Sequence, residues 1–145
     1  MIIEILKALR FRRDYNRLSK WIVKTVEGAE SYEEIEEPMR MLSGLGAHGL
    51  MDCKVFAGLV WMREDKPWYN PDKALEILEP LAEDGNPAAQ FNVALLLYEG
   101  ITRRGMDAIT GLYWMQKAAA GGELHAKEFL RQREEGWELP NSRLS

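Results

Sequence analysis

The chain has 145 residues, a net charge of −4, and 46% hydrophobic and 29% charged residues. These values are typical of one globular domain that is long enough to bury a single core. The modest negative charge argues against a general nucleic-acid binder, which needs a clear basic excess. The single cysteine, Cys53, cannot form an internal disulfide, which favours a reducing compartment. No stretch reaches the roughly 20 apolar residues of a membrane helix, and the start of the chain does not match a signal peptide, so a cytoplasmic protein is expected.

Apolar residues recur at helical spacing along most of the chain, and this pattern predicts an all-α fold. Ser31 and Glu34 match a capping box at the start of the second helix. Pro38 either kinks that helix or marks its first turn. Residues 136–145, which include Pro140, are expected to form a tail. The predicted helices cover residues 2–28, 31–42, 50–63, 71–82, 87–98, 107–120 and 123–135.

The first predicted helix is basic. Residues 1–29 carry seven Lys or Arg against three acidic residues, and aromatic residues lie among the arginines. Such a segment can attach to a membrane or stack on nucleic-acid bases. It can also pack beside the acidic run at residues 30–37 of the same molecule, and we favour this interpretation. Binding to nucleic acid or membrane through the basic helix 1–24 is therefore only the alternative function.

Two segments in the second half of the chain are nearly the same. Residues 75–89 align with residues 112–126 at an offset of 37 positions, which pairs Gly85 with Gly122. A helical pattern that recurs every 35–45 residues or so is the signature of a helical-repeat solenoid. The expected class of function is therefore the binding of a partner.

The matched residues resemble a known repeat. Its second helix and turn are represented by Asp107, Gly111, Trp114, Lys117, Ala118, Ala119 and Gly122, and its first helix by Ala89, Asn92, Val93, Ala94 and Gly100. With these residues the chain resembles the Sel-one-like repeat family, a relative of the tetratricopeptide repeat. The resemblance implies a short right-handed α-α superhelix, a tetratricopeptide-like solenoid with a helical N-terminal cap. The single domain at residues 1–145 would contain a cap or degenerate repeat at 1–46, repeats at 47–135 and the tail at 136–145.

The chain departs from the family pattern at two places. The loop that starts at Gly100 lacks the usual Gly-x-Gly-Val, and Asp107 arrives one residue late. At the 37-residue offset, Arg131 takes the position of Ala94, where a close helix crossing needs a small side chain. This arginine predicts that the array ends there and that the last helix has a solvated outer face.

The sequence offers few groups for catalysis, so we expect the protein not to be an enzyme and to have no catalytic residues. Cys53 is expected to be a buried core thiol rather than a nucleophile paired with His48. His125 is expected on the surface. One cysteine and two distant histidines cannot supply a zinc site, and there is no phosphate loop or dinucleotide motif. We therefore expect no metal and no small-molecule cofactor.

The predicted function is non-catalytic protein–protein interaction. The chain would be an adaptor, or a small inhibitor, chaperone or immunity-type partner, that binds a protein or peptide through the repeat surface. Because the array is short, it can bind one peptide or one domain, or pair with itself as a homodimer. In solenoids the first helices of successive pairs line a concave groove, and Lys54, Gln90 and Asn92 are the polar candidates on those helices.

Aromatic and basic residues complete the candidate binding site. Trp68 and Tyr69, in a loop bounded by prolines, are typical interface anchors, although they can instead cover the ends of the helix layer. Arg103 and Arg104 lie in the loop that departs most from the family pattern, which makes that loop a candidate specificity element. Three further tryptophans are expected in the core: Trp21, Trp61 and Trp114.

Overall fold

The computed structural model describes residues 17–18, 20–47 and 51–144. All regular elements in these ranges are helical, which confirms the all-α class predicted from the sequence. None of the described helices combines the length and the apolar character that a bilayer-spanning helix needs. The elements are a helix over residues 20–28, the 3₁₀ turn η1 (Tyr32–Ile35), and the helices α2 (Glu36–Ala47), α3 (Met51–Val60), α4 (Pro71–Glu83), α5 (Pro87–Glu99), α6 (Ala108–Ala120) and α7 (Leu124–Leu144).

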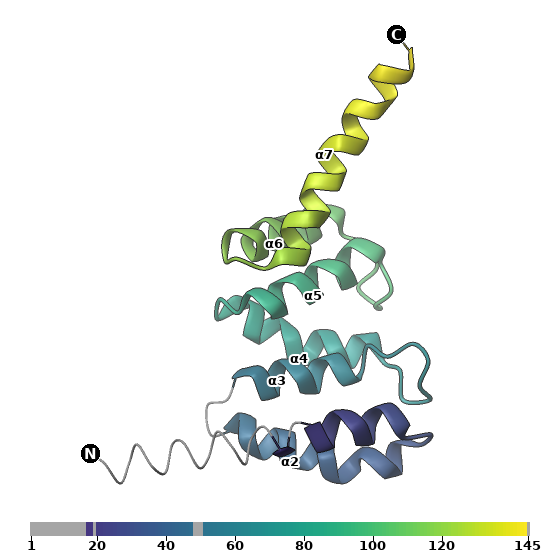
Figure 1. The fold of residues 1–145 in the computed structure, drawn as a ribbon, viewed down its shortest axis with the longest axis vertical. Coiled ribbons are helices and arrows are strands. Elements are labelled where there is room, and N and C mark those ends of the chain that lie inside the picture. The colour runs from purple at the N-terminus through teal and green to yellow at the C-terminus, as the bar shows by residue number, and fades with distance from the viewer. Residues whose placement is uncertain (1–16, 19, 48–50, 145) are drawn as a thin grey trace, which may run out of the picture.

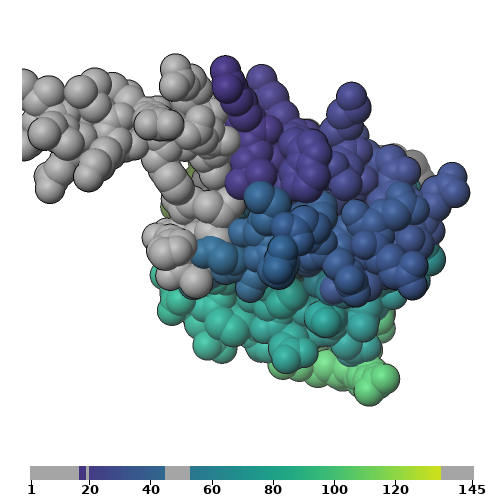
Figure 2. Space-filling model, turned by 90° about the horizontal axis from the view of Figure 1, so that it is seen from below, coloured from purple at the N-terminus to yellow at the C-terminus, as the bar shows by residue number. Residues whose placement is uncertain are grey.

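The helices are stacked in chain order along the long axis of the molecule (Figure 1). Each helix packs mainly against its neighbours in sequence, and α5 also contacts α3. One continuous apolar core follows the stack from Ile22 to Ala126. Figure 2, seen from below, shows the same order, with the purple and blue N-terminal segments beside the teal segments that follow them. In Figure 1 the far half of α7 projects from the end of the stack.

Three helices begin at side chains that cap them. Asn70, Asn86 and Asp107 each accept a hydrogen bond from the backbone N–H three residues later, at 3.0–3.1 Å. These bonds satisfy backbone donors that have no partner inside the first helical turn. Pro71 and Pro87 follow two of the caps and occupy the first helical position, as predicted.

The cap at Asp107 predicts a pH dependence of stability. Hydrogen bonds from Thr110 lower the pKa of the Asp107 carboxyl, and the nearby Arg104 lowers it further. A carboxyl whose pKa is lower in the folded chain stabilises folding above its unfolded pKa, and this stabilisation is lost as the pH falls through the folded pKa. We therefore expect acid unfolding below about pH 4 to be shallower in Asp107→Asn, because asparagine caps equally well and cannot titrate. Thermal melts between pH 2.5 and 7 would measure this; identical slopes in both proteins would contradict it.

The repeat found in the sequence has a counterpart in the structure, a turn that is built twice. Gly85 and Gly122 both have φ of +97°, a left-handed value that favours glycine. Their N–H groups donate to the carbonyls of Ala82 and Ala119, each at 3.0 Å. In both copies the next residue donates to the carbonyl five positions earlier, again at 3.0 Å. The alignment at an offset of 37 therefore matches residues with the same local geometry.

The start of α2 differs from its prediction. Ser31 precedes the 3₁₀ turn η1 and not an α-helix, and its side chain makes no capping hydrogen bond to the backbone. Its hydroxyl instead donates to a carboxylate oxygen of Glu34 at 3.4 Å. That same carboxylate oxygen lies 3.4 Å from the backbone N–H of Glu30. The α-helix begins only at Glu36, so Pro38 lies in its first turn, where a proline removes no helical hydrogen bond. Of the two predicted roles of Pro38, the structure supports the first turn.

The last helix does not end at residue 135 as predicted, because α7 continues to Leu144, through the residues predicted as a tail (136–145). A glycine costs a helix about 1 kcal/mol and a proline about 3 kcal/mol, but neither must end it. Gly136 and Pro140 therefore lie within α7 and do not end it. The last helix is predicted to have a solvated outer face at Arg131. Arg131 is indeed exposed, and its guanidinium donates to Glu128 of the same helix at 2.9 Å.

Two of the three tryptophans expected in the core are buried, and one is not. Trp61 and Trp114 are buried, as expected, but Trp21 is 45% exposed and is not a core residue. Ile22 and Val26 form the buried face of the first helix, as their helical spacing predicts, and Trp21 lies beside that face. The side chain of Trp137 lies outside the described part of the chain.

Candidate functional site

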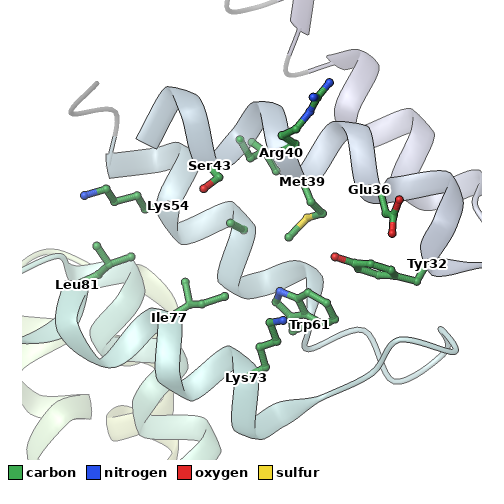
Figure 3. A pocket seen from close by; sticks show the side chains of 12 residues that line it. Tyr32, Glu36, Met39, Arg40, Ser43, Lys54, Trp61, Lys73, Ile77 and Leu81 are labelled. Atoms are coloured by element: carbon green, nitrogen blue, oxygen red, sulfur yellow. The ribbon is translucent and has the colours of Figure 1, made fainter. Parts of the chain in front are cut away.

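A groove of about 810 Å³ lies between α2, α3 and α4. This volume is within the range of about 300–1,000 Å³ that is usual for ligand sites. In Figure 3, α3 runs along the middle of the groove, with α2 and α4 on either side. The apolar part of the lining comes from all three helices and the residue after α3, and includes Met39, Ala57, Trp61, Ile77 and Leu81. The groove therefore exposes apolar surface that the fold itself does not cover.

Charged residues border the apolar lining. Lys54, Lys73 and Arg40 contribute cations, whereas Glu36 is the only carboxylate among the described lining residues. Arg40 is paired with Glu37, which does not line the groove. The groove is thus electropositive on a chain whose net charge is −4. An anionic group would be attracted to it.

Trp61 is held at one end of the groove. Its indole ring is stacked on the ring of Tyr32, with centroids 5.3 Å apart, and the Nζ atom of Lys73 lies 4.4 Å from its centroid. The side chain is only 7% exposed. The backbone is fixed as well, because the N–H of Asn70 donates to the Trp61 carbonyl at 2.8 Å. Trp61 is therefore a rigid part of the groove.

The indole N–H of Trp61 is buried and has no hydrogen-bond acceptor among the described residues. A tryptophan N–H can only donate. Leaving such a group buried without a partner costs about 1–3 kcal/mol. In Figure 3 the nitrogen lies on the edge of the ring that faces Met39 and the interior of the groove. The groove therefore contains one polar group that is not satisfied by the fold.

Of the predicted site residues, Lys54 is the one that lines the groove. Trp68 is not an exposed anchor: it is 6% exposed, and its indole N–H donates to the carbonyl of Val60 at 3.0 Å. The adjacent Tyr69 is half-buried, and burial, followed by the charge of Glu64, raises the pKa of its hydroxyl. The proline-bounded loop thus packs its larger aromatic residue into the core.

The two polar candidates on α5 also serve the fold. Gln90 is buried, and its side-chain amide donates to the carbonyl of Ala82 at 3.1 Å, which joins α5 to the end of α4. Asn92 donates to the carbonyl of Ala88 in its own helix at 2.8 Å. Neither side chain lines the groove. The hydrogen bonds of both side chains belong to the fold, and their part in partner binding stays a prediction.

The loop between α5 and α6 is tied to α4. The backbone N–H of Arg103 donates to a carboxylate oxygen of Asp72 at 2.7 Å, while the Arg103 side chain is 94% exposed. The guanidinium of Arg104 makes two hydrogen bonds of 2.9 Å to Glu79, and these bonds raise its pKa. The loop is expected to be a specificity element, and the structure exposes both arginine side chains, but that of Arg104 is held by Glu79, so Arg103 is the more open of the two.

The remaining candidates are placed as follows. Cys53 is buried, as predicted for a core thiol, while His48 lies outside the described residues. His125 is on the surface, as predicted, and its ring is stacked on Phe91 at 5.7 Å. In the basic helix, the described cations Arg17, Lys20 and Lys24 are exposed. The other basic residues of that segment, Arg12 and Arg13 among them, are not in the described ranges, so attachment through it stays a prediction.

Comparison with protein-family models, with curated proteins and with solved structures finds no match to this chain.

Proposed function

We propose that the protein is a non-catalytic binding module that holds a segment of another protein in the groove between α2, α3 and α4. The observation that carries the proposal is the groove itself: about 810 Å³ of mostly apolar concave surface beside a buried N–H without an acceptor in the described chain. Apolar grooves between helices are a common site for peptide recognition. A chain of this kind could act as an adaptor, an inhibitor, a chaperone or an immunity-type partner.

The proposal includes the repeat architecture. We propose that α3 to α7 form a short tetratricopeptide-like solenoid of the Sel-one-like kind, with the preceding helices as its cap. Two findings support this: helices that pack in chain order, and the turn that recurs at Gly85 and Gly122 with the same φ. Arg131, exposed on α7, supports an end of the array at that helix. In such arrays the concave surfaces of stacked helices are the binding surfaces.

A second surface also exposes large apolar side chains. Ile109 and Tyr113 are one turn apart on α6 and are 85% and 49% exposed, and Met106 lies beside them in sequence. This α6 face is an alternative interface with a partner or with a second copy. We favour the groove because it is concave and carries an unsatisfied polar group.

Site-specific photo-crosslinking can distinguish the two surfaces. A benzoylphenylalanine in place of Ser43 would lie in the groove, and the same residue in place of Ile109 would lie on the α6 face. Each full-length protein would be irradiated in an extract of the source cell, and the products identified by mass spectrometry. We expect one protein to be crosslinked from position 43 and not from position 109. Crosslinks from position 109 alone would move the interface to α6, and crosslinks from neither would contradict a binding function.

A further inference from the structure

We infer that the groove selects an acidic, apolar peptide segment of a partner protein, in which a backbone carbonyl accepts the indole N–H of Trp61 and a side-chain carboxylate pairs with Lys54. This inference rests on the proposed function and specifies the chemistry of its ligand. It follows from the unsatisfied donor, from the cations around the groove and from the distance between them.

The first requirement is a hydrogen-bond acceptor. The Trp61 N–H is buried at the groove without an acceptor in the described chain, whereas the N–H of Trp68 donates to Val60. Trp61 and Trp68 therefore differ in whether the fold satisfies the indole N–H, and of the two only Trp61 lines the groove. A ligand that places a carbonyl oxygen against this edge would recover the free energy that the isolated donor costs. Every peptide backbone carries such oxygens.

The second requirement is negative charge. Lys54 lines the groove and makes no ion pair with any described residue, so its ammonium is available to a ligand. Lys73 is held over the ring of Trp61 and adds positive charge at the other end. A carboxylate among the apolar side chains of a ligand would gain a charge-assisted hydrogen bond from Lys54. A basic segment would be repelled by both lysines.

The third requirement is a defined spacing. Lys54 lies on α3 and Trp61 directly follows that helix, seven residues later, which corresponds to about 10 Å along a helix axis. In Figure 3, Lys54 and Trp61 mark the two ends of the groove. An extended peptide rises about 3.3 Å per residue, so an acidic residue about three positions from the bonded carbonyl would reach both groups. The apolar side chains between them would contact Met39, Ile77 and Leu81.

The inference can be tested with three pools of dye-labelled 12-residue peptides, acetylated and amidated so that only side chains carry charge. The pools combine Leu and Phe with Asp and Glu, with Lys and Arg, or with Ser and Asn. Fluorescence polarisation against the full-length protein would measure affinity. We expect the acidic pool to bind at least tenfold more tightly than the basic pool.

Matched variants test the two contacts. Trp61→Phe keeps an aromatic ring against Tyr32 and is expected to weaken binding of the acidic pool about fivefold to tenfold, with a melting temperature that is unchanged or higher. Trp68→Phe removes a satisfied N–H and is expected to show the reverse, a lower melting temperature with unchanged affinity. Lys54→Glu is expected to weaken binding about tenfold, unlike Lys127→Glu, which reverses an exposed charge on α7.

Each other result overturns the inference in a recognisable way. Preference for the basic or neutral pool, or binding that ignores Trp61→Phe and Lys54→Glu, would reject the acidic ligand but leave the groove as a binding site. Self-association in the ultracentrifuge that Trp61→Phe weakens would replace the partner with a second copy. If no pool binds, crosslinking from position 43 shows that only the ligand chemistry is wrong, and its absence removes the proposed function as well.

Discussion

Replacing Trp68 with alanine is expected to lower the free energy of unfolding by about 3–5 kcal/mol, the usual range for the loss of a buried large aromatic side chain. Two contacts explain the size of the effect. The side chain is 6% exposed within the core, and its N–H satisfies the carbonyl of Val60, which the substitution would leave without its partner. Urea unfolding followed by circular dichroism would measure the change.

The same experiment separates a core role of Trp68 from an interface role. Tyr69, its half-buried neighbour, is the matched control, and Tyr69→Ala is expected to have a clearly smaller effect on stability. If Trp68→Ala unfolded at the wild-type urea concentration and yet lost partner binding, Trp68 would be an interface anchor after all. Any loss of binding in Trp68→Ala must therefore be corrected for the fraction of unfolded protein.

Gly111→Ala is expected to destabilise the protein by about 1–3 kcal/mol, as overpacking does in a close helix crossing. An added Cβ at Gly111 would lie 3.1 Å from the carbonyl oxygen of Ala94 and 3.1 Å from the backbone nitrogen of Tyr98. These are backbone atoms of α5, so they cannot move aside as a flexible side chain can. Thermal and urea unfolding of the variant would show the loss.

Gly44→Ala is the control, because it is expected to raise the free energy of unfolding, whereas Gly111→Ala lowers it. Gly44 lies within α2, and a Cβ built there has no heavy atom within 4 Å outside its own turn. Alanine in a helix interior is favoured over glycine by about 0.5–1 kcal/mol, so this variant is expected to be more stable than wild type. A stable Gly111→Ala protein would mean that α5 and α6 can separate without cost, contrary to the close crossing described above.

Local features of the fold were predictable from the sequence. The turns at Gly85 and Gly122 and the helix start at Pro87 depend on residues within one or two turns of one another, so short patterns are enough to identify them. The capping box at Ser31 failed because an equally local alternative, the 3₁₀ turn, competes for the same residues. Trp114 is buried in the core, as expected.

The candidate site was not predictable in the same way, because it depends on packing between helices. Trp61 was correctly predicted as buried, but nothing in the sequence indicates that its N–H lacks an acceptor or that Tyr32 covers its ring. Trp68 lies in a loop, so no helical spacing of apolar residues indicates that it is buried. It is buried because the loop folds back, as the hydrogen bond from Asn70 to the Trp61 carbonyl shows. Gln90 is polar and is therefore a reasonable candidate for partner binding, but its side-chain amide donates to the carbonyl of Ala82 within the fold.

The stacking of helices in chain order separates the two ends of the molecule energetically. Native contacts join residues that are close in sequence, so the contact order is low and a fast, sequential folding reaction is expected. The terminal helix α7 packs on α6 and, through Phe91 and Tyr98, on α5. Fraying of α7 therefore removes contacts with α5 and α6, neither of which lines the groove of α2, α3 and α4. Sequence changes can accumulate at that end of the chain with little effect on what the groove binds.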